Sequence, residues 1–352
     1  MVLGLFKNSF LGIDIGTTAI KVVEISKKVK GLEMTSYGVL EKYGHLERIN
    51  GAVQTPTLKL LEEGTALLIR ELLEKSRVKA REVSMGLPNF LGFTSMIEMP
   101  YMPSRDLAKA VRFQAEQYIP MPLKEVTLDW QVLEESPPKI TLLLIAVPTE
   151  HVQRYIKTAE LAKLELKNLE LEATAVCYLF GKKEKNPVLI IDLGGRVTSF
   201  SIMDNGTLRS LYYVEIGGGD FTQVIANGLS INPIRAEQLK KTYGFNLKMQ
   251  EGIDLLKVLN PFLERMSQEA EKLINGYYFK TKKKVEKIFL IGGGANLVGI
   301  EDYFSHRLGI PAIIADPFSL KLIDYRPEIA PIIKELGPSL TVACALGAKY
   351  FF

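Results

Sequence analysis

Two aspartates in this sequence each follow an apolar run and precede a glycine by one residue. Asp14 and Gly16 end one such run, and Asp192 and Gly194 end another. Backbone amides in a glycine-containing hairpin can approach phosphate oxygens closely, because no Cβ intervenes. An aspartate at the strand end would repel the phosphate unless Mg²⁺ lies between them, usually through waters. The pattern therefore predicts a phosphate site in which Asp14 and Asp192 hold the metal and serve catalysis.

Each aspartate lies in a strand–turn–strand unit, because a second apolar run follows each turn. The aspartates are 192 − 14 = 178 positions apart, about half of the 352 residues, which suggests two domains of related build that face one another. One such turn alone would be interpreted as an ordinary hairpin, and Lys21 could simply be exposed on the second strand. The residues predicted to bind phosphate are Gly16, Thr17, Thr18, Lys21, Gly194, Gly195 and Arg196.

A run of three glycines, Gly292 to Gly294, follows a third apolar stretch. Three glycines let the backbone approach a flat or charged ligand, here the adenosine and α-phosphate of a nucleotide. The residues predicted to bind the nucleotide therefore also include Gly292, Gly293, Gly294 and Asn296. A helix is expected to begin near residue 297 or 298. A Rossmann fold would need its glycine motif near the first strand and an acidic residue about 20 positions later. The position near the C-terminus therefore disfavours that alternative.

The composition is that of an ordinary globular protein, with 47% hydrophobic and 24% charged residues. A net charge of +4 gives no electrostatic reason for the whole molecule to bind nucleic acid. Two lysine-rich runs, 182–185 and 280–284, are interpreted as solvated faces beside strands. Cys177 and Cys344 stand in apolar helical stretches, which favours a reducing cytoplasm over a metal site. No apolar run is expected to reach the roughly 18 residues of a transmembrane helix.

The region 83–172 alternates strands and helices in about 90 residues and is interpreted as an insertion. Strands are expected at 83–88, 93–100, 127–133 and 140–147. Helices are expected at 104–118, with Ser104 as the N-cap, and at 149–161. A strand, a glycine-rich turn and a helix are expected over 214–221, and a C-terminal helix of small residues over 339–350.

In this order, the motifs resemble those of the actin, sugar kinase and Hsp70 superfamily. The two aspartate–glycine turns are similar to its two phosphate motifs, the triple glycine to its adenosine motif, and the segments 214–221 and 339–350 to its connecting segments. The resemblance implies ATP as cofactor, with Gly217 and Gly218 near the phosphates. It also implies that Glu237 and Lys240, three apart on one helix face, bind the ribose, although a surface ion pair is an equal alternative. Glu215 lies near the position of a polar residue that orients water.

The stretch from Arg112 to Pro122 closely resembles the PilM family of type IV pilus systems, which is related to FtsA. The resemblance implies an ATP-binding scaffold that docks the cytoplasmic N-terminal peptide of PilN between the first domain and the insertion. It implies a cytoplasmic protein peripheral to the inner membrane, with membrane contact through its partner. Pilus assembly or retraction ATPases are further implied partners, and the protein is expected to be a monomer or weakly self-associating. Arg196 replaces a glycine of the second phosphate motif and could reach a phosphate or point away, and in either case hydrolysis is expected to be slow.

The expected fold is α/β, with duplicated actin-like (ribonuclease H-like) domains around a nucleotide cleft and an FtsA-type inserted α+β subdomain. The first domain is expected to contain residues 1–82, 173–187 and 336–352, the insertion 83–172, and the second domain 188–335. An FtsA-like filament protein would share this fold, but such proteins usually end in an amphipathic membrane helix, whereas this chain stops after its closing helix. A small-molecule kinase would need a carboxylate base and a polar substrate pocket, which no polar cluster in the N-terminal half suggests.

Overall fold

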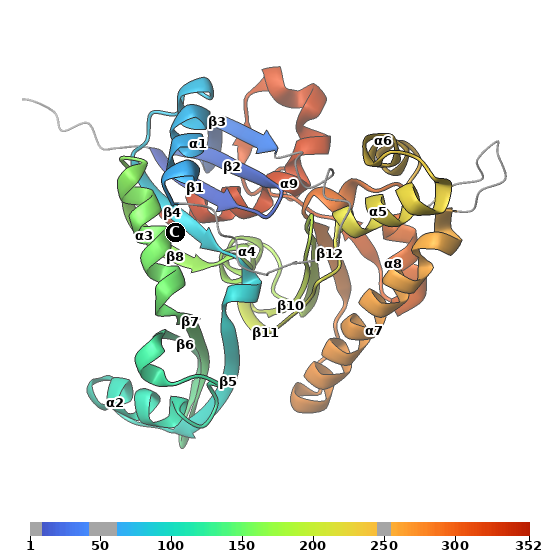
Figure 1. The fold of residues 1–352 in the computed structure, drawn as a ribbon. Helices are drawn as coiled ribbons and strands as arrows, with labels where there is room; N and C mark the ends of the chain where they lie inside the picture. Colours follow the sequence, from blue (N-terminus) through green and yellow to red (C-terminus); the bar gives the residue numbers. More distant parts are fainter. Residues whose placement is uncertain (1–8, 42–61, 245–254) are drawn as a thin grey trace, which may run out of the picture.

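The computed structural model describes residues 9–41, 62–244 and 255–352, and their strands form three sheets (Figure 1). The first sheet has six strands in the order β14-β3-β2-β1-β4-β8. Its strands are β1 (Ser9–Ile15), β2 (Ala19–Lys27), β3 (Leu32–Glu41), β4 (Glu82–Leu87), β8 (Glu165–Leu171) and β14 (Asp324–Tyr325).

The second sheet has five strands in the order β11-β10-β9-β12-β13. Its strands are β9 (Val188–Leu193), β10 (Thr198–Asp204), β11 (Thr207–Val214), β12 (Lys287–Ile291) and β13 (Ala312–Ile314). In both sheets three successive antiparallel strands are followed by two parallel ones, so β1-β2-β3-β4-β8 corresponds to β9-β10-β11-β12-β13. The shared order confirms the predicted duplication of an actin-like domain.

Two helices occupy the space between the sheets, α4 (Glu172–Phe180) and α9 (Ala330–Lys349). Their buried residues form one apolar core with Val23 and Ile25 of β2 and with Val188 and Ile190 of β9. The outer face of the first sheet packs on α1 (Glu62–Lys75) and α3 (Thr149–Leu161). The second sheet is covered by α5 (Gly218–Leu229), α6 (Pro233–Tyr243), α7 (Leu255–Thr281) and α8 (Ile300–Leu308).

The approach of α9 to β1 depends on glycine. A Cβ atom on Gly12 would lie 2.0 Å from the carbonyl oxygen of Ala343 and 2.5 Å from the backbone nitrogen of Gly347. The helix backbone therefore rests directly on the strand backbone, with no side chain between them. Because side chains alternate along a strand, Asp14 projects to the same side as Gly12 and so faces the space between the sheets.

By length and composition, the helical stretch Pro327–Lys349 could cross a membrane, with a mean hydropathy of 1.4. The core helix of a globular protein can meet the same criteria, and Lys334 and Glu335 interrupt this stretch, so the finding does not contradict the expectation about apolar runs. Within the fold, α9 packs against β1, β2, β4 and α4. This is the position of a core helix.

The third sheet is a small separate module at the lower left of Figure 1, with the strand order β5-β7-β6. It consists of β5 (Phe93–Pro100), β6 (Val126–Ser136), β7 (Lys139–Pro148) and α2 (Ser104–Ala115), and we call it the three-stranded module. The insertion predicted over 83–172 is wider than this module. Its outer strands β4 and β8 pair into the first sheet, and α3 packs on α1, so only 93–148 form an independent sheet.

Two predicted helix boundaries are corrected. Pro103, in an extended conformation, is the N-cap of α2, and Ser104 is its first residue and forms no capping bond. The helix ends at Ala115, not at residue 118, because the chain then tightens into turns, in which Gln117 donates to Gln114 and Tyr118 donates to Ala115. After the triple glycine a short 3₁₀ helix (Gly293–Asn296) precedes α8. This helix begins at Ile300, because Gly299 adopts the left-handed conformation with φ of 85°.

Candidate functional site

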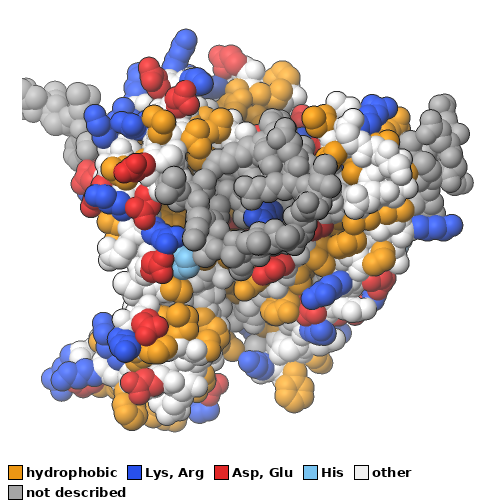
Figure 2. All heavy atoms as spheres, viewed as in Figure 1, with side chains coloured by type: hydrophobic (Ala, Val, Ile, Leu, Met, Phe, Trp, Pro, Cys, Tyr) orange, Lys and Arg blue, Asp and Glu red, His pale blue; other side chains and the backbone are white. Residues whose placement is uncertain are grey.

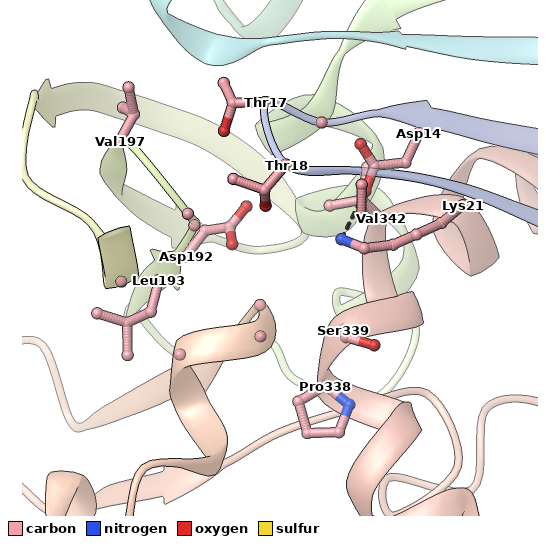
Figure 3. Close-up of a pocket in the computed structure, with 18 of the residues that line it drawn as sticks. Asp14, Thr17, Thr18, Lys21, Asp192, Leu193, Val197, Pro338, Ser339 and Val342 are labelled. Carbon is pink, nitrogen blue, oxygen red and sulfur yellow. Dashed lines mark hydrogen bonds and ion pairs between the residues drawn. The ribbon is translucent and has the colours of Figure 1, made fainter. Parts of the chain in front are cut away.

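A cavity of about 440 Å³ lies between the two actin-like sheets, and all three glycine-containing motifs reach it (Figure 3). The turns after β1 and β9 form its upper walls, and the triple glycine and α9 form its lower walls. The predicted residues that line it are Asp14, Gly16, Thr17, Thr18, Lys21, Asp192, Gly194, Gly195, Gly218, Glu237, Lys240, Gly292, Gly293, Gly294 and Asn296.

The two turns meet across the cavity. A Cβ on Gly195 would lie 2.4 Å from Cγ2 of Thr18, so the second turn approaches the first to contact distance only because it carries glycine there. The second turn is also supported from behind, since the backbone nitrogen of Gly218 donates to the carbonyl of Gly194 at 2.9 Å, and that of Gly219 to Gly195 at 2.7 Å. The N-terminus of α5 thus fixes the second turn, and its first amides are engaged by the turn's carbonyls.

Lys21 lies beside the carboxylates of the cavity. Its Nζ donates to Oδ2 of Asp14 at 3.0 Å, and only 17% of the lysine side chain is exposed (Figure 3). Burial alone would lower the pKa of Lys21, but the adjacent Asp14 outweighs it and the pKa is raised. Lys21 therefore remains cationic and points into the cavity, as expected of a phosphate-binding side chain and contrary to the alternative of an exposed strand residue.

Three carboxyl groups from different elements share this charge. Burial raises the pKa of Asp192 to about 6, with Lys21 opposing the rise and Asp14 adding to it. Burial also raises the pKa of Glu172 well above its usual range, and the charges of Asp14 and Asp192 contribute. One lysine facing three acids leaves a surplus of negative charge, which a divalent cation would relieve.

This geometry predicts that the stability of the ligand-free protein depends on pH through Asp192. An unfolded aspartate ionises near pH 3.9. The folded protein retains this proton until about pH 6 and so binds more protons than the unfolded chain between these values. The free energy of unfolding should therefore fall by about 2 kcal/mol as the pH rises from 4 to 7. Urea unfolding of wild type and Asp192→Asn at several pH values measures this contribution, because asparagine does not titrate. A difference between the two proteins that stays constant from pH 4 to 7 would contradict the prediction.

The three consecutive glycines have different roles. Gly292 has φ of 83°, and a Cβ there would lie 2.4 Å from Oδ1 of Asp192. A Cβ on Gly294 would lie 2.8 Å from Cβ of Leu193. Gly293 has no neighbour within 4 Å of such a Cβ. The outer glycines are thus needed for packing, whereas the middle one presents bare backbone to the cavity.

Glu237 and Lys240 of α6 both line the cavity and also pair with each other. Lys240 Nζ lies 2.6 Å from Oε2 of Glu237 and donates to the carbonyl of Gly218 at 2.8 Å and to Oγ1 of Thr222 at 2.9 Å. Burial lowers the pKa of Lys240, and the charge of Glu237 opposes this. The pair is buried between α5 and α6 and is not the surface ion pair considered as an alternative.

Three predicted site residues lie elsewhere. Arg196 is exposed and is not among the residues that line the cavity. Gly217 packs beneath the second turn, where a Cβ would lie 2.6 Å from the backbone nitrogen of Arg196. Glu215 is exposed and lines a separate hollow with Phe262 and Arg265 of α7. Strand β11 ends at Val214, and Glu215 follows it on the surface, outside the residues that line the cavity. Its predicted role in orienting water is not supported.

A further carboxyl group that lines the cavity is that of Glu172, which the sequence reasoning missed. It is the first residue of α4, and the next backbone nitrogen, that of Ala173, donates to Oδ1 of Asn89 at 2.9 Å. Asn89 is buried and also donates to Oγ of Ser199 on β10 at 2.9 Å. The sequence does show a glutamate directly before a run of small residues at the start of α4. Its distance in sequence from the two turns, however, gave no reason to place it in the same site.

The donor set can be compared with the predicted metal. Carboxylate oxygens suit Mg²⁺, which usually keeps several waters and takes few protein ligands. In the described part of the chain, no group of three or more His, Cys, Asp or Glu side chains is arranged to hold a metal directly. Asp14 and Asp192 therefore fit a hydrated Mg²⁺ held through water, and this assignment stays a prediction.

Comparisons with known proteins agree with this architecture. The family described as type IV pilus assembly protein PilM matches residues 12–351. A chaperone protein DnaK of Thermus thermophilus is 27% identical over 288 residues, covering 74% of this chain but only 42% of the DnaK chain.

Two solved structures share the fold. A PilM-PilN type IV pilus biogenesis complex superposes with a TM-score of 0.82 at 24% identity, covering 96% of this chain and 97% of the other. MreB5 of Spiroplasma citri bound to AMPPNP gives a TM-score of 0.53 at 15% identity, covering 98% and 96%. The predicted actin-like fold is thereby confirmed.

Proposed function

Because the chain belongs to the type IV pilus assembly protein PilM family, we propose that it is an ATP-binding scaffold of the pilus assembly machinery. Nucleotide binding is supported by one observation: two aspartate–glycine turns and a triple glycine line the same cavity. The scaffold would act at the cytoplasmic face of the inner membrane.

In this proposal, each part of Mg²⁺-ATP would contact a different wall of the cavity. The turns at Gly16 and Gly194, with Lys21, would hold the phosphates, and Asp14 and Asp192 would hold Mg²⁺ through water. The bare backbone of Gly293 would lie against the adenosine, and the Glu237–Lys240 pair would face the ribose. Bound Mg²⁺ supplies charge neutralisation between the phosphates and the carboxylates.

The site favours retention of nucleotide over rapid turnover. Attack on the γ-phosphate needs an oriented water and compensation of the developing charge. Glu172 lines the cavity and would be the candidate to orient that water, but burial raises its pKa, and a protonated carboxyl group is a poor base. Arg196 is exposed and is not among the residues that line the cavity, so it makes no contact there that would compensate this charge. We infer slow hydrolysis, or none, with the nucleotide acting as a switch.

The proposed partner is the cytoplasmic N-terminal peptide of a PilN-type membrane protein. A solved structure that shares the fold over 96% of this chain is a PilM-PilN complex. An extended peptide can be held by main-chain hydrogen bonds and a few apolar pockets. Attachment to the membrane would then come through this peptide, and pilus assembly or retraction ATPases remain further candidate partners.

A calorimetric titration with a PilN-type N-terminal peptide tests the scaffold function. We expect dissociation constants of about micromolar order, as for short peptides ordered on binding, and a change when Mg²⁺-ATP is present. A peptide of the same composition in scrambled order is the control. If nucleotide binds but the peptide does not in either state, the pilus assignment is wrong. An FtsA-like filament protein then becomes the better proposal, tested by sedimentation of polymers.

A further inference from the structure

The two lysine-rich runs of the sequence lie side by side in the fold. They meet at the edge of the second sheet where β9 and β12 begin. The backbone nitrogen of Asn205, in the turn after β10, donates to the carbonyl of Lys185 at 3.0 Å, and that of Glu286 donates to the carbonyl of Pro187 at 3.0 Å. Lys283 Nζ lies 2.8 Å from Oδ2 of Asp204. Segments 100 residues apart thus form one surface.

This surface concentrates the positive charge of the protein. Segments 182–187, 204–205 and 280–287 together carry eight lysines and three acidic residues, a net charge of +5. The whole chain has a net charge of +4, so all other residues together carry −1. We call the eight side chains the lysine surface: Lys182, Lys183, Lys185, Lys280, Lys282, Lys283, Lys284 and Lys287.

The acidic residues of these segments do not neutralise it. Asp204 is buried and binds Lys283 and the hydroxyl of Tyr277, and Glu184 pairs with Lys287. Among the described residues, no acidic side chain forms an ion pair with the other three lysines of the 280–284 run, and all three are exposed. These are Lys280, Lys282 and Lys284.

Exposed aromatic rings accompany the lysines. Phe279, near the C-terminal end of α7, is 77% exposed, and Tyr278 is 44% exposed. Lys282 Nζ lies 4.8 Å from the centre of the Phe279 ring. At the other run, Lys182 Nζ lies 4.4 Å from the ring centre of Phe352, which is 48% exposed. The C-terminal end of α7 projects from the body of the molecule at the bottom of Figure 1.

We propose that the lysine surface, with Phe279 at its tip, binds an anionic lipid surface directly. Clustered lysines are attracted to acidic headgroups, and aromatic rings partition into the headgroup boundary. Binding of a nucleic acid would not explain an exposed phenylalanine at the end of a projecting helix. The remainder of the chain has a net charge of −1 and would not add to the attraction of a nucleic acid. This contact goes beyond the proposed function, in which the membrane is reached through a partner peptide.

Flotation of the full chain with lipid vesicles, without any peptide, tests this proposal. We expect binding to vesicles that contain phosphatidylglycerol, weak binding to neutral phosphatidylcholine vesicles, and loss of binding as salt increases. The triple variant Lys280→Gln, Lys282→Gln, Lys284→Gln should bind anionic vesicles about 100-fold more weakly, at about fivefold for each lysine. Phe279→Ser, which keeps the charge, should weaken binding about tenfold.

A matched triple variant removes three exposed lysines elsewhere, Lys30→Gln, Lys79→Gln and Lys109→Gln, and should bind like wild type. Equal losses in the two triple variants would overturn the proposal, as would absence of wild-type binding to anionic vesicles at low salt. Tighter binding to duplex DNA than to vesicles, dependent on the same lysines, would identify a nucleic-acid surface instead. Since the vesicles carry no peptide, failure here leaves the peptide titration, and thus the scaffold function, unaffected.

Discussion

A Gly12→Ala substitution is expected to destabilise the protein by more than about 3 kcal/mol, at the upper end of the cost of overpacking a core. The new Cβ would lie 2.0 Å from the carbonyl oxygen of Ala343 and 2.5 Å from the backbone nitrogen of Gly347. Both are backbone atoms of α9, so no side chain can rotate away to make room. The helix must move off β1 as a unit, which opens the core shared by both domains.

The matched control is Gly276→Ala in α7, where no atom lies within 4 Å of the new Cβ. Alanine there should stabilise the helix by roughly 0.5–1 kcal/mol, because glycine is the poorer helix former. Thermal and urea unfolding of the two variants measure both effects. A Gly12→Ala protein with wild-type stability would show that α9 does not rest on β1 as described.

A Gly293→Val substitution is expected to weaken nucleotide binding by about 100-fold, or 2.7 kcal/mol, while leaving the fold intact. Gly293 lines the cavity, and nothing lies within 4 Å of a Cβ placed there. The valine side chain therefore costs the empty protein little and occupies the volume that the adenosine would fill. Titration with a fluorescent ATP analogue gives the affinity, and urea unfolding gives the stability.

The neighbouring Gly292→Val substitution separates packing from ligand exclusion. At φ of 83° and 2.4 Å from Asp192 Oδ1, valine at position 292 should lower stability as well as affinity. Wild-type affinity in Gly293→Val would mean that the nucleotide does not lie against the triple glycine, and the assignment of the adenosine wall would fail.

Local patterns were sufficient to predict the two turns and the repeated domain. Asp14 and Asp192 end buried strands, and strand alternation alone directs both side chains to the inner faces of the sheets. Glu172 could not be predicted in this way. It comes from the start of a helix and reaches the cavity through tertiary packing, whereas Glu215 had the expected neighbours in sequence but ends on the surface.

The extent of the insertion could not be read from the sequence for a similar reason. The strand predicted at 83–88 stands next to those of the three-stranded module in sequence, and β8 was not predicted as a strand. Only strand pairing assigns β4 and β8 to the first sheet. The lysine surface likewise depends on pairing. Each run alone is an ordinary charged loop, and the placement of β9 beside β12 brings them together.

Asn89 lies at the root of the three-stranded module, between β4 and β5, and its side chain joins three parts of the molecule. One end accepts the first free amide of α4, and the other donates to Ser199 in the second domain. A displacement of the module's root that moves Asn89 therefore also moves the first turn of α4, with Glu172 on it. Any coupling between two binding sites through Asn89 acts in both directions, because the effect of one ligand on the affinity for another is reciprocal. If a partner that shifts the module changes the affinity for nucleotide through this contact, nucleotide changes the affinity for that partner by the same factor.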